Sequence, residues 1–224
     1  MDALRVAPLG DAAVVVTFGD AFDEQVNERV MALAAALGEH PLPAAVRDIV
    51  PAIASLVVHV DPAAGPLEPL IDELRLRASK SYPAEYSRLR GGATSPIQDI
   101  PVRYGREEGP DLGDVAAFAG ASEEDVIARH AARTYRVYML GFLPGFAYLG
   151  QVDPSIAAPR RSTPRQAVPA GSVGIAGLQT GVYPQVSPGG WQIIGRTAAS
   201  MFDTASGRSL LQPGDRVRFV PERR

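Results

Sequence analysis

The sequence contains no cysteine, which excludes disulfides, thiolate nucleophiles and cysteine metal sites. Of its 22 lysine and arginine residues, Lys80 is the only lysine. A P-loop needs a lysine after a glycine-rich run, and Schiff-base and Ser-x-x-Lys chemistry need one as well. Lys80 lies in RASKSYP, which fits none of these patterns. The chain therefore lacks the lysine-dependent equipment of nucleotide hydrolysis.

The sequence is also poor in the features of membrane and nucleic-acid-binding proteins. No apolar run approaches the roughly 18 residues that span a bilayer. The first residues, MDALRVAPLGDAAVVV, lack the basic stretch and long apolar core of a signal peptide. The net charge of −3 indicates no general attraction to nucleic acid or anionic lipid. We expect a cytoplasmic protein without a membrane or nucleic-acid partner.

Only three histidines are present, and their scattered positions predict no metal site. His40 lies beside a proline and His59 alternates with valines on an expected strand, so both are interpreted as structural. His130 has two interpretations. An imidazole can carry protons near neutral pH, but a histidine near a helix end also binds nearby carbonyls.

The first 80 residues alternate strand-like and helix-like patterns in the order ββαββα. Residues 14–18, 46–50 and 56–60 are β-branched runs, and apolar residues recur at helical spacing over 22–38, where Gly38 is expected to end the helix. A second helix is expected after Pro66. This order predicts a small α+β domain over residues 1–80, with two helices on one face of a sheet. Residues 81–98 break both periodicities and are interpreted as a connection between domains.

The second domain, residues 99–224, begins with a strand over 100–104 and two helices near 111–119 and 123–133. The second helix opens on Ser122 and three acids, a capping-box pattern. After a strand over 134–140, the segment 141–197 contains 10 glycines and 7 prolines in 57 residues. This density favours short strands joined by tight turns, as in a β-barrel or sandwich.

The same glycine-rich segment carries four arginines against one acid, Asp153. Guanidinium groups bind carboxylates and phosphates through paired hydrogen bonds, and glycine-rich turns let backbone N–H groups approach an anion. The pattern therefore indicates a small anionic ligand, although arginines on the surface of a barrel are an equally plain interpretation. The four residues are Arg160, Arg161, Arg165 and Arg196.

Other catalytic patterns fail on inspection. The run Ala170–Gly174 resembles a nucleophile elbow, but alanine stands where the first glycine is required. The run Gly141–Gly145 has the wrong glycine spacing for a dinucleotide loop. No pair of carboxylates in this segment can divide acid and base roles. The sequence therefore does not describe a self-sufficient enzyme.

Five long blocks of the glycine-rich half form a recognisable series. They are YMLGFLPGFAYLG at 138–150, PRRSTPR at 159–165, VPAGSVG at 168–174, QTGVYP at 179–184 and SPGGWQIIGRT at 187–197. These blocks resemble a known family, allophanate hydrolase subunit 1, which also includes the B subunits of 5-oxoprolinases and a sporulation-kinase inhibitor. They follow one another in the order found in that family, which makes the resemblance specific.

The resemblance implies a small α+β domain followed by a cyclophilin-like β-barrel. It also implies a hetero-oligomer with a C subunit, which is similar to allophanate hydrolase subunit 2, and, for 5-oxoprolinase, functional coupling to an A subunit. The reaction would convert 5-oxoproline, ATP and water to glutamate, ADP and phosphate, with ATP used by the complex and neither biotin nor metal indicated. Two alternatives remain: an inhibitor that docks on a histidine kinase, and one subunit of an allophanate hydrolase or urea-carboxylase-type carboxyltransferase. An autonomous allophanate hydrolase is disfavoured, because its Ser-Ser-Lys triad is missing.

These arguments assign candidate roles to individual residues. Arg165 and His130 are the candidate catalytic residues. The candidate substrate-binding residues are Arg160, Arg196, Gln179, Thr180, Tyr183, Gly141, Phe142, Pro144, Gly145, Gly189, Gly190 and Trp191. Phe142, Phe146 and Trp191 are expected as pocket walls, with barrel core the expected role for at least one of them.

Overall fold

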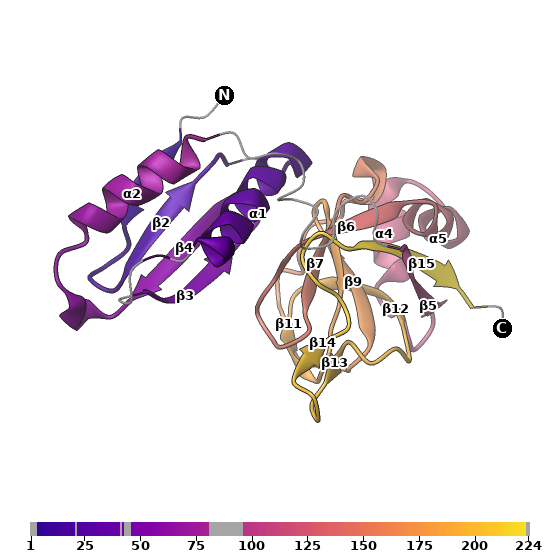
Figure 1. Ribbon diagram of the computed structural model, residues 1–224. Coiled ribbons are helices and arrows are strands. Elements are labelled where there is room, and N and C mark those ends of the chain that lie inside the picture. The colour runs from indigo at the N-terminus through magenta and orange to yellow at the C-terminus, as the bar shows by residue number, and fades with distance from the viewer. Residues whose placement is uncertain (1–3, 21, 41, 43–45, 81–95, 223–224) are drawn as a thin grey trace. The chain divides into compact units, whose positions relative to one another are not determined.

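A computed structural model describes residues 4–20, 22–40, 42, 46–80 and 96–222. The chain divides into two compact units, residues 1–94 and 95–224 (Figure 1). Of the expected connection at 81–98, residues 81–95 lie outside the described part, and Gln98 already belongs to strand β5 (Gln98–Tyr104). The α+β fold with a small sheet-and-helix domain before a barrel is confirmed.

The N-terminal unit is a four-stranded antiparallel sheet with two helices, in the expected order ββαββα. The strand order in space is β1-β2-β4-β3, so the second hairpin pairs through β4 with β2. The elements are β1 (Arg5–Pro8), β2 (Ala13–Thr17), α1 (Glu24–Glu39), β3 (Val46–Pro51), β4 (Ser55–Val60), a 3-10 turn (Pro62–Ala64) and α2 (Glu68–Ala78).

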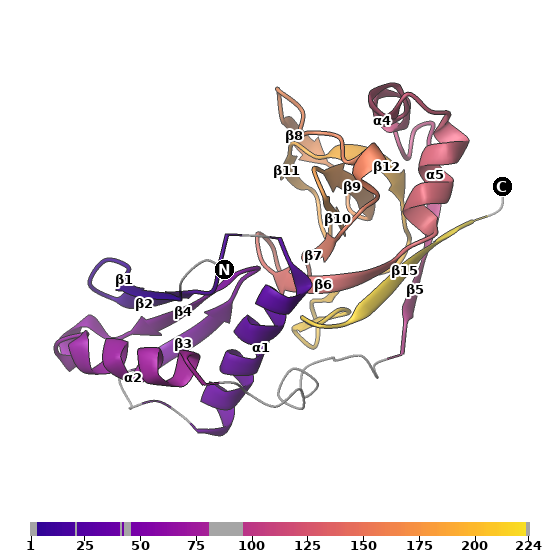
Figure 2. The ribbon, with the colours of Figure 1, turned by 90° about the horizontal axis from the view of Figure 1, so that it is seen from above.

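Both helices cover the same face of this sheet. Helix α1 contacts β3 and β4, and α2 contacts β1 and β2 (Figure 2). Val14 and Val16 point at the helices from alternate positions of β2 and are fully buried, as period-2 alternation requires. Helix α1 begins at an N-cap, Asp23, which accepts a hydrogen bond from the Val26 N–H. The helix runs through Gly38 to Glu39, so the expected end at Gly38 was one residue short.

The C-terminal unit is a closed barrel of seven strands in the order β10-β7-β6-β15-β5-β12-β9. The pair β15–β5 is parallel, and the other neighbours are antiparallel. The strands besides β5 are β6 (Thr134–Leu140), β7 (Ala147–Gly150), β9 (Ser172–Ala176), β10 (Gln179–Val182), β12 (Gln192–Arg196) and β15 (Arg216–Pro221).

Two helices and two small sheets complete this unit. Helix α4 (Leu112–Ala119) contacts β12, and α5 (Glu123–Ala131) contacts β15. The capping box expected at the start of α5 is confirmed, because Ser122 and Asp125 exchange hydrogen bonds between side chain and backbone. The remaining elements are a 3-10 turn (Pro154–Ile156), the pair β8 (Arg165–Val168) and β11 (Ser187–Gly189), and the pair β13 (Phe202–Asp203) and β14 (Arg208–Ser209).

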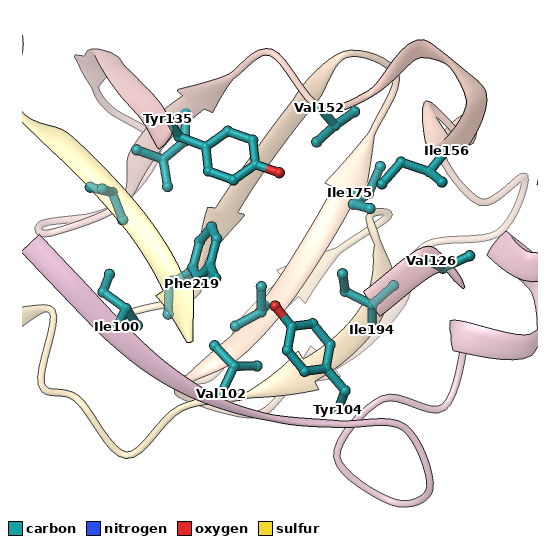
Figure 3. Packing of buried hydrophobic residues seen from close by; sticks show 14 of the residues in the cluster. Ile100, Val102, Tyr104, Val126, Tyr135, Val152, Ile156, Ile175, Ile194 and Phe219 are labelled. Atoms are coloured by element: carbon teal, nitrogen blue, oxygen red, sulfur yellow. The ribbon is translucent and has the colours of Figure 1, made fainter. Parts of the chain in front are cut away.

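Alternate residues of the barrel strands fill its interior. Ile100, Val102 and Tyr104 point inward from β5 with the intervening residues exposed, and Phe219 does so from β15. Figure 3 shows Tyr135 of β6 and Phe219 side by side in this interior. Their ring centres are 5.5 Å apart. The barrel is therefore a packed core rather than a channel.

The helices in the described part of the chain were compared with the length and hydropathy of membrane-spanning helices. None of the helices there combines the length and apolar character that a crossing of the bilayer would need.

Candidate functional site

A pocket of about 270 Å³ lies beside the β8–β11 pair of the barrel unit. Such a volume is at the small end of ligand pockets, which are roughly 300–1,000 Å³. Loops and strand ends that are far apart in sequence form it, as is usual for binding sites on a rigid scaffold. Its lining residues are Phe142, Phe146, Tyr148, Arg160, Pro164, Tyr183, Pro188, Gly189, Gly190 and Trp191. We call it the aromatic pocket.

The wall of the aromatic pocket is a cluster of rings packed edge to face around Phe146. Ring centres of Tyr148, Tyr183 and Trp191 lie 4.9, 5.3 and 5.4 Å from that of Phe146. This is the preferred geometry of aromatic pairs, so the wall is held in shape before any ligand arrives. Phe146 and Trp191 are also buried in a small hydrophobic cluster, which is separate from the cluster that fills the barrel interior.

Two glycines allow close backbone approaches in and beside the pocket, Gly189 to the aromatic wall and Gly145 to the neighbouring chain at Met201. A Cβ on Gly189 would lie 2.8 Å from the Tyr183 ring, which leaves no room for a side chain. Gly145 adopts φ +85, and a Cβ there would lie 2.7 Å from the Met201 carbonyl oxygen. Of the glycines and proline proposed as substrate-binding, Gly189 and Gly190 line the pocket, whereas Gly141, Pro144 and Gly145 belong to the loop that carries Phe142 to its edge.

Arg160 is the one charged side chain among the described residues that line the pocket. Burial raises the pKa of the Tyr148 and Tyr183 hydroxyls, and the Arg160 charge offsets part of this rise. Both hydroxyls therefore stay protonated at neutral pH and can donate hydrogen bonds. A guanidinium and two phenols over an aromatic wall can bind a small anion that also has an apolar part.

A buried carboxylate, Asp111, organises the chain next to this pocket. Its Oδ1 accepts from Arg161 at 2.8 Å and from Arg165 at 2.7 Å, and its Oδ2 accepts from Arg165 at 2.8 Å. The Ile193 N–H also donates to Oδ2 at 2.6 Å. Asp111 itself is 1% exposed. This buried carboxylate therefore joins two guanidinium groups to the backbone of strand β12. These bonds raise the pKa of Arg165 further.

This network corrects the role expected for Arg165. Its guanidinium is committed to Asp111 through both terminal nitrogens, so it is a structural partner and not a catalytic group. Asp153 is the one acid within the glycine-rich segment, but the acid that binds these arginines, Asp111, comes from outside that segment. The sequence singled out Asp111 only by its position at the start of a helix, where aspartate usually caps the helix. In the structure its side chain makes no capping hydrogen bond.

Two further candidates lie outside the aromatic pocket. The Arg196 Nε donates to the Ala170 carbonyl at 2.9 Å on an exposed edge of the barrel. Gln179 is half-buried in β10, where it pairs with Gly150 and Ala176. Neither residue lines the pocket, and of the proposed anion holders only Arg160 does.

His130 lies in the barrel interior with no exposed surface. Thr180 donates its hydroxyl hydrogen to the Gly174 carbonyl at 2.9 Å, so His130 Nε2 must donate to the Thr180 oxygen at 2.9 Å. The other nitrogen, Nδ1, then accepts from the Tyr104 hydroxyl at 2.8 Å. Burial lowers the pKa of His130 to about 3, so the ring is neutral. This corrects two expectations: His130 and Thr180 are structural, and neither a proton carrier nor a substrate contact is supported.

Comparison with known proteins agrees with the fold and with the family resemblance. The chain is 43% identical to the B subunit of the 5-oxoprolinase of Bacillus subtilis over an alignment of 230 positions, which covers 96% of this chain and 92% of that protein. Among solved structures, TTHA0988 superposes with a TM-score of 0.78 at 38% identity. That match covers 95% of this chain but 40% of TTHA0988, so the chain spans less than half of that protein's length.

A more distant structure shares only the fold. The urea carboxylase of Kluyveromyces lactis superposes with a TM-score of 0.80 at 19% identity, over 98% of this chain and 22% of that protein. The family model of the carboxyltransferase domain, subdomain C and D, matches residues 4–211. Since that match extends over most of this chain, the chain belongs to the family of carboxyltransferase domains, subdomain C and D.

Proposed function

We propose that this chain is the B subunit of an ATP-dependent 5-oxoprolinase and that its aromatic pocket holds the small anionic substrate. The observation that carries the proposal is the 43% identity to the B subunit of a 5-oxoprolinase over nearly the full length of both chains. The reaction opens the lactam ring of 5-oxoproline to give glutamate, at the expense of ATP. A cytoplasmic complex with the C and A subunits would supply the groups that this chain lacks.

The need for partners follows from the chemistry present in the chain. It has no P-loop, no cysteine and a single lysine, Lys80. Its one buried imidazole, His130, is neutral and sealed in the core. Among the described pocket residues, none is a carboxylate that could act as a general base. The chain therefore binds and orients substrate, while ATP is bound and the amide bond is cleaved with the help of the partner proteins.

The pocket suits a compact ring that carries one carboxylate. Arg160 can form a charge-assisted pair with the carboxylate, and the aromatic lining of the pocket can pack against the methylene carbons of the ring. Protonated Tyr148 and Tyr183 can donate to a carboxylate or carbonyl oxygen. These contacts fix the orientation of the lactam, which is the contribution of positioning to catalysis.

The proposal is tested by 5-oxoproline-dependent ADP release from this chain mixed with the C and A subunits encoded in the same genome. Each protein is also left out in turn. We expect release only from the complete mixture. Turnover by the chain alone would contradict the need for partners, and no turnover in any mixture would overturn the oxoprolinase assignment.

In the same assay, Arg160→Ala should raise KM for 5-oxoproline by roughly 10- to 100-fold, because a hydrogen-bonded pair with a charged group contributes about 1.5–3 kcal/mol. Arg196→Ala is the matched control, since Arg196 is also exposed but binds a backbone carbonyl outside the pocket. Its KM should equal that of the wild type. Equal KM values for both variants would place the anion site elsewhere.

A further inference from the structure

Phe142 has a backbone conformation that side chains other than glycine rarely adopt. Its φ is +67, in the left-handed region, where the Cβ of a bulky residue is crowded by the following carbonyl. The loop around it is held by backbone hydrogen bonds. The Gly141 N–H donates to the Phe146 carbonyl at 3.1 Å, the Leu143 N–H to the Gly141 carbonyl at 2.8 Å and the Phe146 N–H to the Leu143 carbonyl at 3.0 Å. Strained positions of this kind concentrate at ligand clamps and active sites.

Burial of the side chain does not explain why phenylalanine stands at this position. Phe142 is 59% exposed, so most of its ring surface remains in water. The ring nevertheless lines the aromatic pocket, edge to face with Phe146 at 5.5 Å and with Tyr183 at 6.4 Å. An exposed apolar ring on an unfavourable backbone is a cost to folding that a ligand contact would offset.

We propose that Phe142 is a clamp at the edge of the aromatic pocket that selects ligands with a compact apolar ring next to their carboxylate. This inference rests on the proposed function of the pocket. Arg160 recognises the charge, which any small carboxylate has. Phe142 adds the apolar face of its ring to the pocket. A ligand ring with adjacent methylene groups can pack against this face, and an open-chain ligand covers less of it. The two residues thus divide selection between charge and shape.

The sole tryptophan, Trp191, lines the same pocket, so its fluorescence can report binding to the purified chain. We would titrate 5-oxoproline and N-acetylglycine, an open-chain amide that also carries one carboxylate. The wild type should prefer 5-oxoproline, and Phe142→Gly and Phe142→Ala should each bind it about tenfold more weakly, with little change for N-acetylglycine. Phe118→Ala is the matched control, because Phe118 is 54% exposed on α4 and does not line the pocket.

The stability of two variants tests the backbone strain at Phe142. Glycine relieves the left-handed strain and alanine does not, so Phe142→Gly should unfold in urea at a midpoint equal to or above that of Phe142→Ala. A lower midpoint for the glycine variant would overturn the strain argument.

The binding outcomes distinguish this inference from the proposed function. No response of the wild type to 5-oxoproline would overturn the pocket as the substrate site, and the clamp with it. Equal affinity of the wild type and Phe142→Gly would overturn the clamp alone. If that variant kept its affinity for 5-oxoproline but no longer co-purified with the C subunit, Phe142 would be a partner contact and not a clamp.

Discussion

Asp111→Asn should lower the free energy of unfolding of the barrel by about 3 kcal/mol, since removal of one partner from a buried ion pair costs roughly 3–5 kcal/mol. We expect the lower end because the side chains of Arg161 and Arg165 are 32% and 26% exposed, so water partly solvates the charges left behind. Asparagine would also turn an N–H₂ group toward one of the guanidiniums and lose acceptors that Asp111 supplies.

The measurement is urea unfolding followed by the fluorescence of Trp191, which reports on the barrel unit alone. Asp99→Asn is the matched control. Asp99 also binds an arginine, Arg218, through two hydrogen bonds of 2.9 and 2.8 Å, but that pair is about half exposed. We expect a much smaller shift there, because solvent screens exposed pairs.

A second variant isolates the unpaired charge. Asp111→Asn combined with Arg165→Met should recover part of the lost stability, because removing both partners of a buried pair costs less than removing one. If the single variant were as stable as the Asp99→Asn control, Asp111 would not organise the chain beside the aromatic pocket.

The stability of the barrel should fall as the pH falls below about 6.5, the ordinary pKa of histidine, by about 1.4 kcal/mol per pH unit. The cause is His130, whose pKa is lowered to about 3 in the folded protein by burial. Between these two pKa values His130 is protonated in the unfolded chain and neutral in the folded chain. A fall in pH therefore favours the unfolded state throughout this pH range. The stabilising effect is complete above pH 6.5 and is lost progressively toward pH 3.

Urea unfolding at pH 7.5, 6.5 and 5.0, followed by Trp191 fluorescence, checks this slope before most carboxylates begin to titrate. The expected loss between pH 7.5 and 5.0 is about 2 kcal/mol. His40 and His59 are exposed, and the variant His40→Gln/His59→Gln leaves His130 as the last of the three histidines. This variant should keep the full slope. A flat profile between these pH values would contradict a sealed, neutral His130.

Much of the fold follows from local patterns in the sequence. Period-2 and period-3.6 alternation predicted the order ββαββα, because each element has one face to bury, and Ser122 followed by acids predicted the start of α5. The density of glycine and proline over 141–197 predicted short strands and turns. The combination of arginines with glycine-rich turns was also recognisable in the sequence, and the structure places Arg160 in the lining of the pocket.

What the sequence by itself determined is therefore the class of each element and the kinds of residue near the site. The tertiary structure alone decided which of those residues are available. Arg161 and Arg165 are bound by Asp111, which lies 50 and 54 positions away from them, and His130 is bound by Tyr104 and Thr180. Periodicity indicates on which face of its own helix or strand a residue lies. Ion pairs and buried hydrogen bonds join different elements, and whether those elements meet depends on how the barrel closes. For that reason the sequence predicted an anion site, and only the fold reduced four arginines to one.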